Sequence, residues 1–260
     1  MKNIIKKPYG FILSTGPTGS GKSTTLYAIL NHLNSSEKNI ITVEDPVEYT
    51  LDGLAQAQVN PKAGLTFESG LRSILRQDPD IIMVGEIRDK ETATIAIHSA
   101  LTGHLVLSTL HTNDAPAAVT RMLDLGVPPY LISATLLGVM AQRLVRVLCP
   151  HCKKSSPASS EDEALWDQLV APWKANRPTK FSQPVGCLEC RMTGYRGRVG
   201  IYEILLLSPD MKQAISDSAD VAKLRDLAYR EGMKPLRISG AMRVAAGITT
   251  LAEVIGRATL

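Results

Sequence analysis

Residues 16–23 have the sequence Gly-Pro-Thr-Gly-Ser-Gly-Lys-Ser, which matches the phosphate-binding pattern G-x-x-x-x-G-K-[ST] at every fixed position. An apolar, strand-like run at 10–15 precedes this segment, and a helical pattern from about 23 to 33 follows it. Glycines allow consecutive backbone N–H groups to converge on one point, and the positive end of the following helix attracts anions there. The segment therefore predicts the strand, phosphate loop and helix of an α/β fold. The alternative is a glycine-rich turn with a chance lysine.

The pattern assigns a role to each part of this loop. The Lys22 ammonium is expected to reach the β- and γ-phosphates of a nucleotide, and the Ser23 hydroxyl to ligate Mg²⁺. ATP and Mg²⁺ are therefore the expected cofactors. The candidate nucleotide-binding residues are Gly16, Pro17, Thr18, Gly19, Ser20, Gly21, Lys22, Ser23 and Thr24.

Acidic residues follow two other predicted strands. Glu86 lies just past the apolar run at 81–84, and the stretch at 42–49 places Glu44, Asp45 and Glu48 after the run at 40–43. Ligands gather at the carboxyl ends of parallel strands, so one acid would hold Mg²⁺ through water and another would orient the attacking water. A solvated acidic loop is the alternative for any one of these carboxylates.

Two histidines flank the apolar run at 105–109. His104 and His111 are seven positions apart, which in a regular strand puts them at opposite ends and on opposite faces. His111 follows the carboxyl end and is therefore the one expected nearer the nucleotide. For each, the alternative is a structural histidine.

The same alternation of strand and helix predicts the fold. Apolar runs at 10–15, 40–43, 81–84 and 105–109 are separated by helical patterns at 23–33, 66–76 and 89–101, which predicts a mostly parallel sheet covered by helices. The apolar stretch at 130–141 is too short to span a bilayer and is predicted as a buried helix. The segment 155–163 is predicted as a loop. A strand at 200–207 should precede helices at 218–231 and 233–246, and a short helix capped by Thr249 or Thr250.

The four cysteines of the chain form two Cys-x-x-Cys pairs that are separated by 34 residues, namely Cys149 with Cys152 and Cys187 with Cys190. Four thiolates in two such pairs suit a closed, tetrahedral and therefore structural Zn²⁺ site. The intervening segment exceeds the usual spacing of about 15–20 residues. Two redox pairs or buried free thiols are the alternatives.

Composition limits the classes of function. Hydrophobic residues make up 44% of the 260 residues and charged residues 21%, a balance that can bury a core and differs from that of a disordered chain. The net charge of +4 is a mild excess of positive charge, which nucleic acid or an anionic membrane could use but which does not by itself indicate either partner. With three Phe and two Trp, the sequence lacks the aromatic and basic platform on which nucleic-acid bases stack.

Four motifs occur in a fixed order: GPTGSGKSTT at 16–25, TVEDPVEY at 42–49, LRQDPDIIMVGEIRD at 75–89 and TGHLVLSTLHTND at 102–114. Together they closely resemble the ATPases that power type II secretion and type IV pilus assembly. In that family these stretches are the Walker A motif, the Asp box, an atypical Walker B motif and the His box. The resemblance implies Glu48 as the catalytic glutamate, Glu86 as the Walker B acid that holds Mg²⁺ through water, and His104 and His111 as His-box residues.

The resemblance also implies an architecture. A RecA-like P-loop ATPase core is expected at 1–147, an inserted tetracysteine zinc-binding segment at 148–198 and a mainly helical C-terminal subdomain at 199–260. The family works as a hexameric ring on the cytoplasmic side of the inner membrane, bound to platform and adaptor proteins. Its assembly-type members carry such a tetracysteine segment and its retraction members generally do not. Its members also carry N-terminal domains, one of which supplies arginines to the nucleotide site, so this chain is expected to be a fragment that hydrolyses ATP slowly.

Two other functions are alternatives for this sequence: a RecA-type nucleic-acid motor, and a nucleotide-binding scaffold without turnover. A cluster of basic residues near the cysteines is either a solvated face or a contact surface for a platform protein or a neighbouring subunit. Its members are Arg143, Arg146, Lys153, Lys154, Arg191, Arg196 and Arg198.

Overall fold

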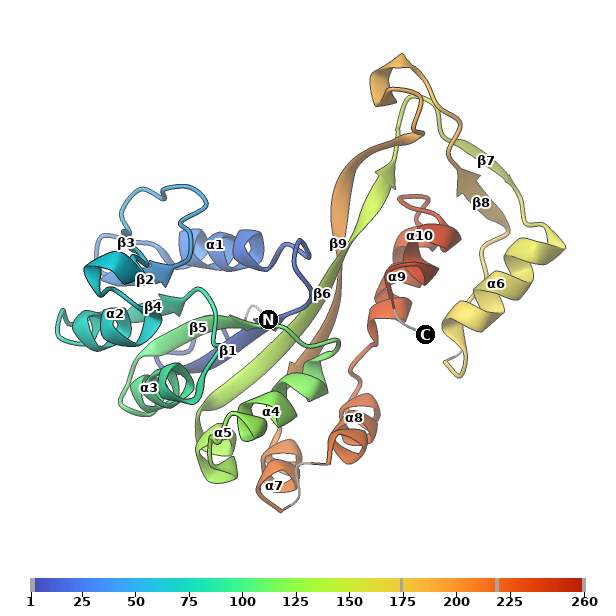
Figure 1. Ribbon diagram of the computed structural model, residues 1–260. Coiled ribbons are helices and arrows are strands. Elements are labelled where there is room, and N and C mark those ends of the chain that lie inside the picture. The colour runs from blue at the N-terminus through green and yellow to red at the C-terminus, as the bar shows by residue number, and fades with distance from the viewer. Residues whose placement is uncertain (1–2, 174, 218–219, 259–260) are drawn as a thin grey trace. The chain divides into compact units, whose positions relative to one another are not determined.

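A computed structural model of the chain describes residues 3–173, 175–217 and 220–258 (Figure 1). The elements of the first half, in chain order, are β1 (Gly10–Thr15), α1 (Lys22–Leu33), β2 (Ile40–Glu44), β3 (Ala55–Gln58), a 3₁₀ turn (Pro61–Ala63), α2 (Phe67–Ile74), β4 (Ile81–Val84), α3 (Lys90–Leu101), β5 (Leu105–Leu110) and α4 (Ala115–Asp124). Those of the second half are α5 (Pro129–Thr135), β6 (Leu136–Leu148), β7 (Lys154–Pro157), α6 (Ser160–Val170), β8 (Lys180–Gln183), a second 3₁₀ turn (Leu188–Cys190), β9 (Tyr195–Leu206), α7 (Pro209–Asp217), α8 (Val221–Arg230), α9 (Leu236–Ala245) and α10 (Leu251–Ile255).

Among the described residues, seven strands form one sheet in the order β3-β2-β4-β5-β1-β6-β9, and β7 and β8 form an antiparallel pair. The pairs β2–β3, β2–β4, β4–β5, β5–β1 and β1–β6 are all parallel. Every residue of β1, β2, β4 and β5 is buried, as expected of strands that are covered on both faces. The predicted parallel α/β sheet is confirmed.

Helices cover both faces of this sheet, and alternate residues of each strand point to different helices. Ile12, Met83 and Leu107 pack against α1, whereas Phe11 and Val84 pack against α2, α3 and α4. The strand and helix predictions at 10–15, 40–43, 81–84, 105–109, 23–33, 66–76 and 89–101 are confirmed to within a few residues at each end.

The chain divides into two compact units. The first comprises Met1–Ala141 with Ile204–Met233, and the second comprises Gln142–Glu203 with Lys234–Leu260. These units differ from the three consecutive segments expected from the sequence because the chain crosses between the two units three times. Met211 and Leu224 are buried in the core of the first unit, while Val254 is buried with Trp166 in the core of the second.

The prediction of a buried helix at 130–141 is wrong for the second half of its length. Helix α5 ends at Thr135, and the thirteen-residue strand β6 begins at Leu136 and pairs with β1. A strand buried on both faces gives a continuous apolar run, which periodicity cannot distinguish from a buried helix. Gly138 lies where β6 closely approaches another part of the chain, because a Cβ there would lie 2.9 Å from the backbone oxygen of Leu205.

The prediction of a loop at 155–163 is also wrong. Strand β7 occupies Lys154–Pro157, and α6 begins directly after Ser159. Ser159 and Asp162 form a capping box, in which each side chain accepts a hydrogen bond from the backbone N–H of the other residue. This Ser-x-x-Asp signature before an apolar run is the signal that the sequence offered for α6.

The C-terminal predictions are confirmed where they can be compared. The strand at 200–207 is part of β9, the helices at 218–231 and 233–246 correspond to α8 and α9, and Thr250 caps α10. The expected start of the first of these helices, Ser218, lies outside the described residues. No described helix combines the length and the apolar character that crossing a bilayer demands.

The packing of α9 on α10 leads to a prediction about the second unit. A Cβ on Gly240 in α9 would overlap Cγ1 of Val254, which is fully buried and cannot move aside into solvent. We expect Gly240→Ala to lower the free energy of unfolding of this unit by about 1–3 kcal/mol, the usual cost of overpacking. Trp166 and Trp173 are the two tryptophans of the chain, so fluorescence during urea unfolding reports on this unit.

The double variant Gly240→Ala/Val254→Ala is the control. Removing both Val254 methyl groups makes room for the new Cβ, so the two effects should combine to less than their sum. Strict additivity of the two unfolding free energies would contradict the proposed overlap.

Candidate functional site

The phosphate loop connects the end of β1 to the start of α1. Gly19 and Gly21 have φ of 75° and 86°, values that residues with a Cβ rarely adopt. Gly21 is the N-cap of α1 and has no side chain that could cap the first N–H groups of that helix. These N–H groups and the positive helix end form the anion-binding geometry that the sequence predicted.

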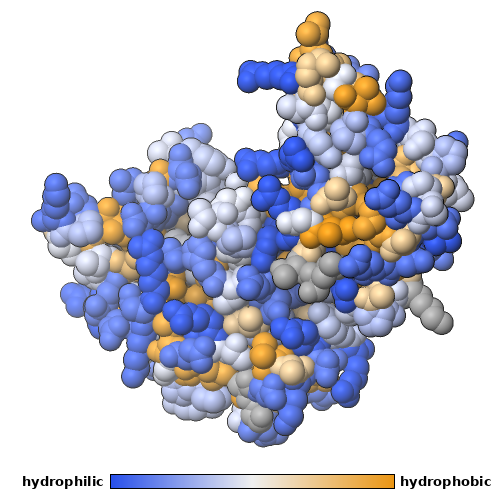
Figure 2. Space-filling view, turned by 45° about the vertical axis from the view of Figure 1, so that its right-hand side comes forward, coloured by the Kyte–Doolittle hydropathy of each residue, from blue (hydrophilic) through white to orange (hydrophobic). Residues whose placement is uncertain are grey.

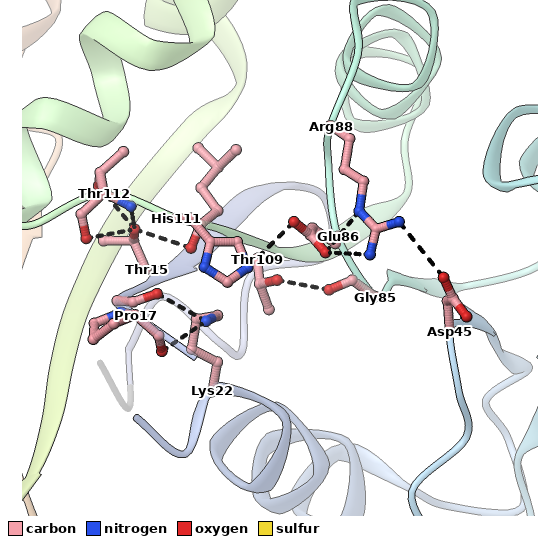
Figure 3. A network of polar contacts seen from close by, with 12 residues as sticks. Thr15, Pro17, Lys22, Asp45, Gly85, Glu86, Arg88, Thr109, His111 and Thr112 are labelled. Atoms are coloured by element: carbon pink, nitrogen blue, oxygen red, sulfur yellow. Dashed lines mark hydrogen bonds and ion pairs between the residues drawn. The ribbon is translucent and has the colours of Figure 1, made fainter. Parts of the chain in front are cut away.

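Lys22 is the first residue of α1, and its side chain folds back over the loop. Its Nζ donates hydrogen bonds to the backbone oxygens of Gly16 at 2.8 Å and Pro17 at 3.2 Å (Figure 3). The side chain is buried, whereas Ser23 is partly buried and Thr24 is exposed. The structure therefore places the expected ammonium at the loop, beside the start of the helix.

Parallel register brings the ends of three other strands to the same edge of the sheet. Thr15 at the end of β1 pairs with Leu110 of β5, and Ser108 of β5 pairs with Val84 of β4. Hydroxyl groups fix these ends: Ser108 Oγ donates to the backbone oxygen of Val84 at 2.7 Å, and Thr109 Oγ1 to that of Gly85 at 2.7 Å. The chain that leaves β4 toward Glu86 is thus held by β5.

Glu86 contacts two basic side chains at this edge. Its Oε1 lies 3.2 Å from Nε2 of His111, and its Oε2 accepts a hydrogen bond from Nε of Arg88 at 2.9 Å (Figure 3). Glu86 and His111 were both predicted site residues, and the structure brings them together.

Arg88 was not predicted. It also lies 3.5 Å from Oδ2 of Asp45, so one guanidinium bridges the ends of β2 and β4. The hydrogen bond to Glu86 is the main cause that raises the pKa of Arg88 above its usual value. The Arg-Asp dipeptide after Glu86 was the only sequence signal for this role, and it did not reveal the partner in the other strand.

The three carboxylates that follow β2 have different environments. Glu44 is 3% exposed, and its oxygens accept hydrogen bonds from the side chains of Tyr27 and Thr42. Asp45 pairs with Arg88, and Glu48 is exposed on the loop after β2. Of the three, Glu48 is therefore the one whose carboxylate faces solvent without a partner in the described part of the chain.

His104 lies away from this group. It precedes β5, where its Nδ1 is 2.9 Å from the backbone oxygen of Ser99 and its own backbone oxygen accepts from the N–H of Gly10. Gly10 begins β1, whereas the phosphate loop follows its end, so the strand separates the two by about 16 Å at 3.3 Å per residue. The structure thus leaves His104 at the opposite edge of the sheet from Lys22, Glu86 and His111.

A cavity of about 470 Å³ opens beside Arg88. Four carboxylates line it, together with Arg88 and apolar or hydroxyl side chains, and the acidic members are Asp45, Glu68, Asp89 and Glu91. Such a lining repels a triphosphate, so the phosphates of a nucleotide belong at the loop before α1 and not in this cavity.

The second unit brings all four cysteines together. Their sulfurs lie within 4.8 Å of one another, and the separations Cys149–Cys187, Cys152–Cys190 and Cys187–Cys190 are 3.9, 3.9 and 3.8 Å. With metal–sulfur bonds of about 2.3 Å, the edge of a tetrahedron is about 3.8 Å, so these positions fit a tetrahedral metal. No cysteine is in a disulfide.

Backbone N–H groups point at the sulfurs of this cluster. Gly186 donates to Cys152 Sγ at 3.3 Å, and Cys187 and Gly194 donate to Cys190 Sγ at 3.2 and 3.1 Å. Burial opposes thiolate formation and raises the pKa of Cys187 to about 11, whereas at Cys190 these N–H donors outweigh burial and lower the pKa to about 6. Donors of this kind stabilise thiolates, which are the form that binds metal.

The basic cluster near the cysteines does not form one uniform face. Arg143 is buried, and Arg146 pairs with Glu253 and lies 4.0 Å over the ring of Tyr195. The other five members, namely Lys153, Lys154, Arg191, Arg196 and Arg198, are exposed. They share the surface with exposed apolar side chains of the second cysteine pair, namely Val185, Leu188 and Met192, and the top of Figure 2 shows apolar beside strongly hydrophilic surface there.

Comparison with known proteins gives consistent matches. Residues 1–256 match the profile of the family described as "Type II/IV secretion system protein". The chain is 52% identical over 252 residues to the type IV pilus assembly ATPase TfpB of Acinetobacter baylyi, which covers 97% of this chain and 43% of that protein. It is 53% identical over 254 residues to the type II secretion system ATPase E of Vibrio cholerae serotype O1, and this alignment covers 98% of this chain and 49% of that protein.

Among solved structures, the pilus retraction motor PilT with bound ADP is similar with a TM-score of 0.71 and 28% identity, over 98% of this chain and 62% of that chain. The chain spans about half the length, or less, of the two curated relatives above. The identities of 52% and 53% are nearly equal, so they do not separate pilus assembly from secretion.

Proposed function

Because the chain belongs to the type II/IV secretion system protein family, we propose that it is the ATP-hydrolysing motor domain of a machine for type II protein secretion or type IV pilus assembly. The observation that carries the proposal is the meeting of the Lys22 loop with Glu86 and His111 at one edge of a parallel sheet. This arrangement puts a phosphate-binding loop beside acidic and basic groups, as phosphoryl transfer requires.

In the proposed mechanism, the N–H groups at the start of α1 and the Lys22 ammonium bind the β- and γ-phosphates. The Ser23 hydroxyl and, through water, Glu86 would hold Mg²⁺, which when bound would neutralise charge on the phosphates. Glu48, exposed on the loop after β2, orients the attacking water. His111 shares Glu86 with Arg88 and so positions the acid. We assign no catalytic role to His104.

We propose Zn²⁺ as the metal of the four cysteines, because four thiolates at tetrahedral separations are its preferred closed structural site. Such a segment favours an assembly or secretion machine over a retraction machine. As the family resemblance implies, the motor would work as a hexamer on the cytoplasmic side of the inner membrane, bound to platform and adaptor proteins. The exposed basic and apolar side chains around Leu188 are a candidate contact surface for such a partner.

Lys22→Ala tests the phosphate site. The variant loses the positive charge at the β- and γ-phosphates, so we expect phosphate release to fall by about 10²-fold or more and ATP binding to weaken. Phosphate release should be measured at high protein concentration, and ATP affinity by calorimetry. Lys38→Ala, which removes an exposed lysine between α1 and β2, is the matched control. Unchanged turnover in Lys22→Ala would reject the phosphate site.

Glu48→Gln tests the water-orienting group. The change keeps the size of the side chain and removes its charge, so kcat should fall by about 10²–10⁴-fold while ATP affinity stays the same. Glu37→Gln, on an exposed turn, is the control. Equal kcat in both variants would move the role to another residue. A wild-type chain that binds ATP but releases no phosphate would instead be a nucleotide-binding scaffold.

Cys187→Ser tests the metal site. We expect metal analysis to find about one zinc per wild-type chain and none in the variant, and the melting temperature of the variant to fall because the metal no longer stabilises the second unit. ATP affinity should persist, since the phosphate loop belongs to the first unit. His151→Ala removes an exposed residue between Cys149 and Cys152 and should keep the zinc. A metal-free wild-type protein of full stability would refute the assignment.

A further inference from the structure

The loop that carries Glu48 has no strand or helix of its own between β2 and β3. Side chains satisfy much of its backbone instead. The N–H of Glu48 donates to the hydroxyl of Tyr27 at 3.3 Å, and the N–H of Leu51 donates to Oε1 of Gln56 at 2.6 Å. Gln56 Nε2 also donates to the backbone oxygen of Tyr49 at 3.2 Å. The conformation of the loop therefore depends on side chains that lie outside it.

Tyr27 is the member of this set that links the loop to the phosphate site. It lies on α1, five residues after Lys22, with only 1% of its surface exposed. Its hydroxyl donates to Oε2 of Glu44 and accepts from the N–H of Glu48. Its ring meets that of Tyr49 edge to face, with centroids 4.7 Å apart and planes at 80°. One buried side chain thus contacts the loop through both its hydroxyl and its ring.

Glu44 holds this hydroxyl in place. The carboxylate is buried at the end of β2 and also accepts hydrogen bonds from Thr42 Oγ1 at 2.6 Å and Gln56 Nε2 at 3.1 Å. Burial and the hydrogen bond to Glu44 raise the pKa of Tyr27 well above its usual value, so the phenol stays protonated and donates a hydrogen bond to Glu44. The phenol oxygen accepts hydrogen bonds from the N–H of Glu48 at 3.3 Å and from Nε2 of Gln56 at 3.4 Å.

We propose that Tyr27 is a positioning residue, whose hydroxyl fixes the backbone of Glu48 and so sets the place of that carboxylate relative to phosphates bound at the start of the same helix. The proposal rests on the proposed function for the role of Glu48. Lys22 and Tyr27 are about 7.5 Å apart along one helix axis, at 1.5 Å per residue. Helix α1 therefore fixes the positions of both the phosphate-binding groups and the water-orienting group.

The test is Tyr27→Phe, which deletes the hydroxyl and keeps the ring and its contact with Tyr49. Because small misplacements of a reacting group cost up to about 10²-fold in rate, we expect kcat to fall by about 10-fold to 10²-fold, with KM for ATP and ATP affinity within about twofold of wild type. Tyr195→Phe is the matched control. It removes a hydroxyl that bonds Thr250 Oγ1 in the second unit and should leave kcat unchanged.

A double variant separates positioning from a purely structural role. If Tyr27 acts through Glu48, Tyr27→Phe should cause little further loss of kcat in a Glu48→Gln background. A loss of the same factor in both backgrounds, or an unchanged kcat in the single variant, would overturn the proposal.

Hydrogen–deuterium exchange supplies a readout without turnover. Tyr27→Phe should speed exchange of the Glu48 amide, whereas amides of the sheet strands should exchange at wild-type rates. Equal protection of the Glu48 amide in both proteins would overturn the proposal. If the wild-type chain releases no phosphate, the proposed function fails, and exchange still decides whether Tyr27 fixes the loop.

Discussion

The parallel pairing of β2, β4, β5 and β1 is the constraint on which the rest of the site depends. Because these strands run in one direction and in close register, their carboxyl ends reach a single edge, and the residues just beyond them meet there. The phosphate loop follows β1, Glu86 follows β4, and Asp45 follows β2. Hydroxyl groups of β5 then fix the outgoing chain by donating to backbone oxygens of the neighbouring strand.

Local signals in the sequence predicted where several candidate residues of both units lie, while the roles of these residues stay predictions. The loop at 16–23, the acid after an apolar run and the two cysteine pairs are contiguous or short-range patterns, and each lies where the sequence placed it. The helix ends at Thr66, Asp89 and Thr250 follow from capping side chains that act within three residues. In these cases the physical cause and the sequence signal occupy the same few residues.

Long-range contacts account for what the sequence did not reveal. Arg88 bridges to Asp45 across two strands, and Tyr27 reaches Glu44 and Glu48 from a different element. No spacing rule marks these pairs, because the distance along the chain is set by the intervening loops. Long-range contacts also define the two units, which spacing along the chain does not predict. Residues 204–233 belong to the first unit although residues 142–203, which precede them, belong to the second.

Two interactions hold the end of β2, the Arg88–Asp45 ion pair and the Tyr27–Glu44 hydrogen bond, and they differ in their exposure to water. The Arg88–Asp45 ion pair is open to water, with side chains 56% and 43% exposed, whereas Tyr27 and Glu44 are almost completely dry. Dissolved salt screens charges that face solvent and has little effect on hydrogen bonds from which water is excluded. Rising ionic strength would therefore weaken the Arg88–Asp45 ion pair first. The contacts of Tyr27 would then be the ones that hold the loop after β2 against α1.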